Sequence, residues 1–76
     1  MTSAQFKAWR LHMKLTKVKT ADMLDISYSS VDAYELGYRR SGDRRAVVVP
    51  QTVALACAAL SLGVVEYDGS EMGTEI

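Results

Sequence analysis

The residues in this sequence that most clearly indicate a binding function are the basic ones, because guanidinium and ammonium groups bind phosphates and other anions. All nine lysines and arginines lie within residues 1–45, which also hold five acids, so this part carries a net charge of +4. Residues 46–76 hold four acids and no lysine or arginine, a net charge of −4. This distribution favours a polyanionic partner for the first part of the chain; a solvated surface without a binding role is the alternative.

The side chains that support catalysis or metal binding are too few or too scattered to form such a site. One histidine, His12, and one cysteine, Cys57, do not make a zinc site from protein ligands alone. Asp22, Asp25 and Asp32 do not converge at their spacing, and nothing matches a phosphate loop or a nucleophile elbow. We therefore expect no enzyme, no bound metal and no cofactor, and we interpret His12 as a surface or phosphate-contacting residue.

Length and apolar patterning limit the architecture. The 76 residues make one domain at most, and the single cysteine excludes an internal disulfide, which fits a reducing cytosol. No apolar run is long enough to span a membrane, and the start lacks the pattern of a signal peptide. We expect a cytoplasmic protein with a folded part at residues 1–65 and an acidic, flexible tail at residues 66–76.

A first helix is expected over about residues 3–14. Thr2 is a suitable N-cap, because a glutamine three residues later completes a capping box. Phe6, Trp9 and Met13 recur at the spacing of one helix face, so we expect them to enter the core. An exposed Trp9 that stacks on a nucleobase is the alternative interpretation.

Two shorter helices are expected over residues 17–24 and 28–36, with three residues between them. Thr16 and Ser27 precede these helices as N-caps, and Gly37 can end the second one in a left-handed conformation. Two short helices joined by a tight turn are the elements of a helix-turn-helix. In that motif the first helix braces the second, whose polar face can then enter the major groove of DNA.

The outer face of the helix at residues 28–36 is expected to contact bases. Val31 and Tyr34 face the core in this register. Five residues then point outward: Tyr28, Ser29, Ser30, Asp32 and Ala33. Serine hydroxyls can bond to most base edges, aspartate can accept from cytosine, and alanine or tyrosine can touch a thymine methyl group. The face has no Arg, Lys, Asn or Gln, so we expect modest direct readout.

Residues 15–39, "LTKVKTADMLDISYSSVDAYELGYR", resemble the helix-turn-helix of lambda-repressor-like domains of the Cro and phage-repressor (XRE) type. The matching positions are Arg10, Leu15, Thr16, Ala21, Leu24, Ile26, Ser27, Val31, Tyr34, Glu35, Gly37 and Arg39. The resemblance implies an all-α, compact fold of four to five helices, and a structural ion pair between Arg10 and Glu35. Three residues depart from the pattern of the family: Lys17, Thr20 and Asp25.

Affinity for DNA is expected to come mainly from contacts to the phosphate backbone. Eight residues are assigned to these contacts: Thr16, Lys17, Lys19, Ser27, Arg39, Arg40, Arg44 and Arg45. The four arginines belong to a loop, which can rest on the backbone or enter a narrow minor groove as an arm. A flexible, solvated loop is the alternative interpretation.

A last helix is expected over residues 50–62, with Pro50 at its first position. The segment is apolar almost all round, which is typical of a helix that is buried on more than one side. It can be a central core helix or a helix shared between two subunits. We expect part of it, with residues 47–49, to form a homodimer interface. The assigned interface residues are Val53, Ala56, Cys57 and Leu60.

The predicted function is sequence-specific transcriptional regulation through double-stranded DNA, with the protein on the nucleoid when bound. The simplest form is a small, phage-like homodimeric repressor that binds an inverted repeat through residues 28–36. RNA polymerase or another protein is a further candidate partner, because Val18, Asp22 and Met23 form a partly apolar outer face. The alternative is a helix-turn-helix adaptor or antitoxin-like protein that acts mainly through a protein partner.

Overall fold

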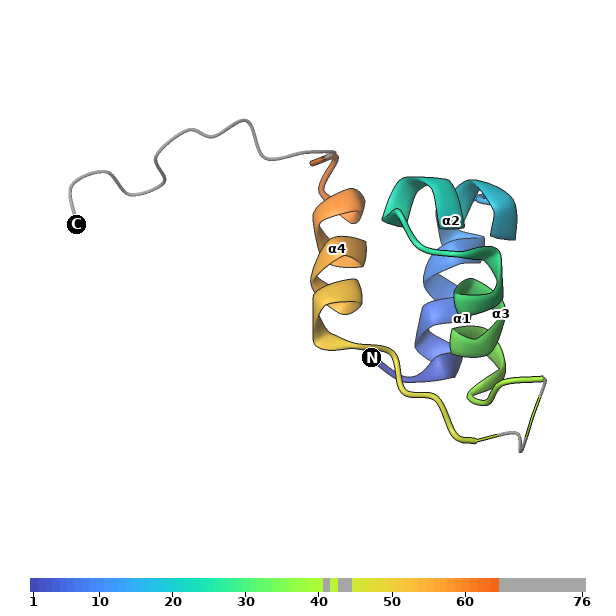
Figure 1. Ribbon diagram of the computed structural model, residues 1–76. Helices are drawn as coiled ribbons and strands as arrows, with labels where there is room; N and C mark the ends of the chain where they lie inside the picture. Colours follow the sequence, from blue (N-terminus) through green and yellow to red (C-terminus); the bar gives the residue numbers. More distant parts are fainter. Residues whose placement is uncertain (41, 43–44, 65–76) are drawn as a thin grey trace.

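The computed structural model describes residues 1–40, 42 and 45–64. Within these residues the chain forms four helices and no strand: α1 (Ser3–His12), α2 (Lys17–Leu24), α3 (Tyr28–Leu36) and α4 (Gln51–Ser61). Figure 1 shows α1, α2 and α3 gathered together, with α4 standing beside them. The expectation of an all-α domain is confirmed for these residues. The acidic tail at residues 66–76 lies outside them.

Side-chain caps fix the starts of the first three helices. Thr2, Thr16 and Ser27 each accept a hydrogen bond from the backbone N–H three residues later, at 3.0, 3.0 and 3.1 Å. Such a bond satisfies one of the N–H groups that a helix start leaves without a partner, and it contributes about 1 kcal/mol. The first and last of these caps also bracket the segment that carries most of the basic side chains.

Three helix boundaries differ from the expected positions: the end of α1, and the start and the end of α4, which ends at Ser61 and not at residue 62. α1 ends at His12, two residues early, because Lys14 adopts a left-handed conformation with φ 59° and the chain turns there toward α2. Pro50 is the N-cap of α4 and not its first helical residue, since its ψ of 152° is extended. A proline in this place has no N–H to leave unbonded, which suits it to a helix start.

The turn between α2 and α3 is set by the backbone. Asp25 is left-handed, with φ 56° and ψ 46°, and its N–H donates to the carbonyl of Asp22 at 3.3 Å. Aspartate tolerates this conformation better than most residues other than glycine. The N–H of Ile26 donates to the carbonyl of Ala21 at 3.0 Å, and the Ile26 side chain packs partly buried against the core. The turn therefore fixes the direction in which α3 leaves α2.

The chain reverses again after α3. Gly37 has φ 83°, and a Cβ atom there would lie 3.2 Å from Oγ of Ser3, so both conformation and space favour glycine. An isolated antiparallel bridge joins Tyr38 to Ala46, and the N–H of Val47 donates to the carbonyl of Gly37 at 2.9 Å. These contacts bring the basic loop back to the end of α3 before the chain enters α4.

An aromatic cluster forms part of the core between α1 and α3. Phe6 and Val31 are completely buried, and the ring of Tyr34 meets that of Phe6 edge-on, with centroids 5.7 Å apart. Trp9 packs partly buried against the same cluster, and its Nε1 donates to Oγ of Ser61 at 2.9 Å. Trp9 therefore ties α1 to α4, as the core interpretation requires, and is not a free stacking platform.

α4 closes the core from the side of α2. Val53 and Cys57 point into the core, with 9% and 1% of their surfaces exposed. Thr20 on α2 is fully buried, and its hydroxyl donates to the carbonyl of Thr16 at 2.8 Å, so this polar residue is satisfied in a core position. Among the described residues no helix is long and apolar enough to cross a membrane.

Candidate nucleic-acid interface

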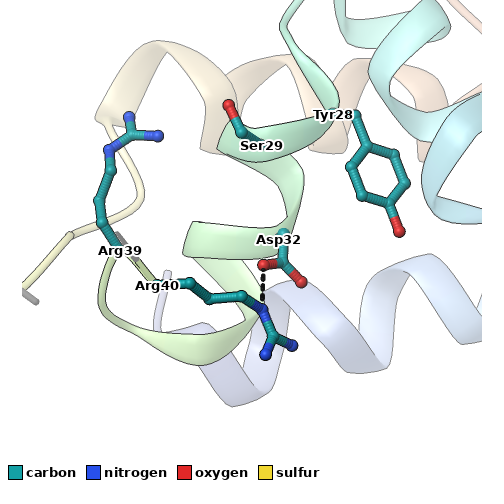
Figure 2. A pocket seen from close by; sticks show the side chains of 5 residues that line it. All are labelled: Tyr28, Ser29, Asp32, Arg39 and Arg40. Carbon is teal, nitrogen blue, oxygen red and sulfur yellow. Dashed lines mark hydrogen bonds and ion pairs between the residues drawn. The ribbon is translucent and has the colours of Figure 1, made fainter. Parts of the chain in front are cut away.

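The outer face of α3 and the chain that follows it enclose a shallow concavity of about 300 Å³ (Figure 2). Its lining residues are Tyr28, Ser29, Asp32, Arg39 and Arg40. Tyr28 is 52% exposed, and in the view of Figure 2 it and Arg39 lie on opposite sides of Asp32. The concavity therefore joins a phenol, a hydroxyl, a carboxylate and two guanidinium groups on one open surface.

Asp32 lies at the centre of this surface and binds two cations. Its Oδ1 accepts a hydrogen bond from Nζ of Lys17 at 3.0 Å, and its Oδ2 accepts one from Nε of Arg40 at 2.7 Å. These two bonds hold the pKa of Asp32 below its ordinary value, and the bond from Arg40 has the larger effect. The carboxylate is therefore charged at neutral pH. We refer to Lys17, Asp32 and Arg40 as the Asp32 cluster; its net charge is +1.

The Asp32 cluster changes what two of the expected site residues can do. Asp32 does lie on the outer face of α3, yet both of its carboxylate oxygens are occupied. A cytosine amino group would have to displace Lys17 or Arg40 to reach it. The Lys17 side chain, 29% exposed, is turned toward Asp32 and away from open solvent. Neither residue is available in this conformation for the separate contact that its position alone suggests.

Ala33 does not belong to the outer face, and the expectation for this residue is wrong. Its exposed surface is 2%, and it counts among the buried residues of the core. Ala33 lies about 100° around the helix from Tyr34. At that edge a single methyl group does not reach past its larger neighbours. Ala33 is therefore removed from the candidate base contacts.

Three serine hydroxyls meet at the start of α3. Ser27 Oγ donates to Ser30 Oγ at 2.9 Å and lies 3.1 Å from Ser29 Oγ. Ser27 and Ser29 are exposed, whereas Ser30 is half-buried. Hydroxyls that donate and accept within one group can exchange partners with a phosphate or a base edge at small cost. This group lies at a helix start, where the N–H groups also favour anions.

The remaining residues assigned to the phosphate backbone are exposed where the structure describes them. Thr16, Arg39 and Arg45 are exposed, and the N–H of Arg39 donates to the carbonyl of Arg45 at 3.2 Å, which brings these two positions together. Lys19 is 3.9 Å from an acid of its own helix, with 60% of its side chain exposed, a contact that contributes little. Arg44 lies outside the described residues.

A second ion pair lies on the inner side of α3. Arg10 donates from Nε and, at 3.1 Å, from Nη2 to the two carboxylate oxygens of Glu35, and from Nη1 to the carbonyl of Leu15 at 2.8 Å. The side chains are only 11% and 4% exposed. The bond to Glu35 is the main cause that raises the pKa of Arg10 above its ordinary value. The pair that the family resemblance implies thus joins α1 to the end of α3.

Two of the four residues assigned to a subunit interface face the other way. Val53 and Cys57 are buried in the core of their own chain, so their assignment to an interface is wrong. The physical reason is that a helix that is apolar all round gives no sign of which side meets the core. Ala56 and Leu60 are half-buried at the boundary. Burial also raises the pKa of the Cys57 thiol to about 11, so it stays protonated.

A different apolar stripe on α4 is exposed. Leu55 is 60% exposed and Leu62 83% exposed. Gln51 and Ala58, also exposed, complete the spacing of one helix face with them. Val48, just before the helix, is 78% exposed. The exposed face of α4 is thus the one opposite Cys57. This face can be identified only from the orientation of α4 on the core.

The sequence assigns Lys17 and Arg40 to the phosphate backbone, and both lie against Asp32 instead. Asp32 is the acid on the outer face of α3, and the arginine-rich loop follows, which is a signal for such a pair. Among the residues that the structure describes, no three histidine, cysteine or acidic side chains gather as a metal site requires. Comparison of the chain with protein-family models, with curated proteins and with solved structures finds no match.

Proposed function

We propose that this chain is a DNA-binding transcriptional regulator of the lambda-repressor-like type, with α2 and α3 as a helix-turn-helix and α3 in the major groove. The observation that carries the proposal is the outer face of α3. Its exposed Tyr28 and Ser29 serve no purpose in the core, and Arg39 and Arg40 line the same concavity. A rigid helix that presents polar groups beside cations is suited to a groove between two phosphate strands.

The packing of α2 and α3 supports a fixed presentation of that face. The small Ala21 is buried where the two helices approach, and Ile26 fills the turn between them. The Arg10–Glu35 ion pair holds the far end of α3 against α1. A reading helix that is held at both ends meets DNA without first losing conformational freedom, which favours affinity.

The basic residues supply an attraction that does not depend on base sequence. Lys19 and Arg39 are exposed, and the Asp32 cluster adds a net positive charge. Contacts of this kind release counterions from DNA, so affinity falls steeply as salt rises. We assign Thr16, Ser27 and Arg45 to the same backbone surface because they are exposed: Thr16 and Ser27 at the starts of α2 and α3, and Arg45 beside Arg39 after α3.

The exposed stripe of α4 supports a homodimer. Residues 46–64 contain no charged side chain, so two copies can meet there without like-charge repulsion. Leu55 and Leu62 would pack against the same residues of the second subunit, with Ala58 between them. The small alanine allows the two helices to approach closely. A dimer places two α3 helices on successive turns of the major groove, about 34–36 Å apart on an inverted repeat. Binding across a promoter would repress transcription by occluding it, in the cytoplasm at the nucleoid.

A gel-shift titration on genomic DNA fragments, with an apparent affinity at several salt concentrations, tests this proposal. The expected result is binding near 50 mM salt that weakens by about a thousandfold at 200 mM. Arg39→Ala removes one phosphate contact from each subunit, so the slope of log affinity against log salt should flatten by about two units in the dimer.

Lys7→Ala is the matched control. Lys7 is exposed on α1, and its substitution removes the same charge outside the proposed interface. It should leave the slope nearly unchanged. Absence of binding at 50 mM salt would reject the proposal. Equal flattening by both variants would reject the placement of DNA against α3.

An adaptor or antitoxin-like protein is the second candidate. The full occupation of Asp32 and the burial of Ala33 leave few base-reading groups on α3. Val18 is 68% exposed on α2 and Leu11 56% exposed on α1, which suits contact with another protein such as RNA polymerase. Failure to bind DNA at low salt, with stable folding, would favour this function.

A further inference from the structure

Arg40 is fixed on the outer face of α3 although it belongs to the loop that follows. It lies eight residues after Asp32, and its Nε donates to Asp32 Oδ2 at 2.7 Å. Figure 2 shows the Arg40 side chain running back along the surface of α3 to this contact. A guanidinium group is thereby added to a helix face whose own residues include no basic side chain.

The contact with Asp32 uses only one part of the guanidinium group. Within the described part of the chain, the Nε–Oδ2 bond is the hydrogen bond that Arg40 makes, and both terminal Nη groups remain available. The side chain is 66% exposed. Two parallel N–H donors at the end of a planar group match the O6 and N7 acceptors that guanine presents in the major groove.

Asp32 is itself held in place, so it can orient Arg40. Its second oxygen binds Nζ of Lys17 at 3.0 Å, and its side chain is only 14% exposed. A carboxylate that is anchored on both oxygens restricts the rotamers of the arginine that binds it. An arginine whose orientation is set before binding loses less entropy when it meets a base.

We propose that Arg40 reads a guanine in each half-site and that Asp32 is its positioning residue. This inference rests on the proposed function and names the base contact that the serine-rich face of α3 lacks. A phosphate contact suits Arg40 less well, because the neighbouring carboxylate repels a phosphate. A cytosine contact by Asp32 suits the geometry less well, because both carboxylate oxygens are occupied.

The experiment starts from a duplex that the wild-type protein selects from a random DNA pool. Each guanine is then replaced in turn by 7-deazaguanine, which removes the N7 acceptor and leaves base pairing intact. Wild-type protein should lose about tenfold in affinity at one guanine of each half-site. Arg40→Lys keeps the charge and loses the two parallel donors, so this variant should bind both duplexes about equally.

Arg39→Lys is the matched control, because Arg39 borders the same concavity and is not bonded to Asp32. It should keep the sensitivity to 7-deazaguanine. Asp32→Ala should reduce that sensitivity while it strengthens binding to unrelated DNA, since it removes a negative charge. A merely structural role of Asp32 would instead weaken binding to both kinds of DNA together.

The outcomes separate this inference from the proposed function. Binding of a selected duplex with no guanine sensitive to loss of N7, or unchanged sensitivity in Arg40→Lys, would overturn the inference and leave DNA binding in place. Failure of the wild-type protein to bind any duplex at low salt would overturn both.

Discussion

α3 carries two carboxylates three residues apart, and they bind basic side chains in different surroundings. Glu35 lies inward, 4% exposed, with both oxygens bonded to Arg10. Asp32 lies outward, 14% exposed, and shares its oxygens between Lys17 and Arg40. The chemistry is the same, but the inner pair joins two helices of the core, whereas the outer group holds Arg40, whose side chain is 66% exposed, at the open surface.

α4 repeats this contrast with apolar residues. Cys57 is 1% exposed and belongs to the core, while Leu55, two residues earlier, is 60% exposed. Burial away from water is favourable for both apolar side chains. Within this chain only Cys57 is buried. The comparison teaches that the position around the helix axis, and not the residue type, separates the apolar side chains that this chain buries from those that it leaves exposed.

The largest expected effect that leaves the chain folded is on the inner face of α3. Glu35→Ala leaves the Arg10 guanidinium without its carboxylate at 11% exposure, which should lower the free energy of unfolding by about 3 kcal/mol. Urea unfolding followed by circular dichroism measures this loss. Asp32→Ala is the matched variant on the outer face and should cost clearly less, because water can solvate Lys17 and Arg40, whose side chains are 29% and 66% exposed. Equal losses for the two variants would show that the faces do not differ.

The second effect concerns the two faces of α4. Leu55→Glu places a charge on the exposed stripe, and a two-fold interface would carry it twice, so self-association should weaken by about a hundredfold. Sedimentation velocity over a range of concentrations measures the association. Val53→Glu, the matched change on the inner face, should instead abolish folding, because it buries an unpaired charge. A wild-type chain that stays monomeric at high concentration would contradict the interface.

The smallest effect is the pH dependence of the Asp32 cluster. The folded pKa of Asp32 lies below the ordinary value of 3.8, so its contribution is complete above that value and is lost as pH falls through the folded pKa. The difference in urea midpoint between wild type and Asp32→Asn should therefore be constant from about pH 8 to 5 and shrink toward pH 3. A difference that disappears near pH 6 would assign the effect to another group.

Local signals in the sequence predicted most of the helix boundaries. Thr2, Thr16 and Ser27 act through bonds to residues three positions away, and Gly37 acts through its own backbone, so a short window contains the relevant physics. Asp25 has the left-handed conformation that the turn requires, and aspartate tolerates this conformation better than most residues other than glycine. The bounds of α2 and α3 were predicted correctly for this reason.

The residues that were misplaced depend on contacts between distant segments. Ala33 is buried because of what surrounds the edge of α3, and Cys57 is buried because α4 turns that side to the core. Arg40 lies on α3 because a loop conformation lets Nε reach Asp32. When a helix is apolar all round, the pattern of residue types does not show which side faces the core. The pattern also does not show the path that a loop follows.

Amide NMR chemical shifts recorded during titration with a selected duplex test the central claim most directly. We expect the largest shift changes at residues 27–32 and at Arg39 and Arg40, with small changes at Val53 and Cys57 in the core of α4. This pattern would place α3 against the bases. Changes confined to α4, or none at a DNA concentration that saturates binding, would contradict a reading role for the outer face of α3.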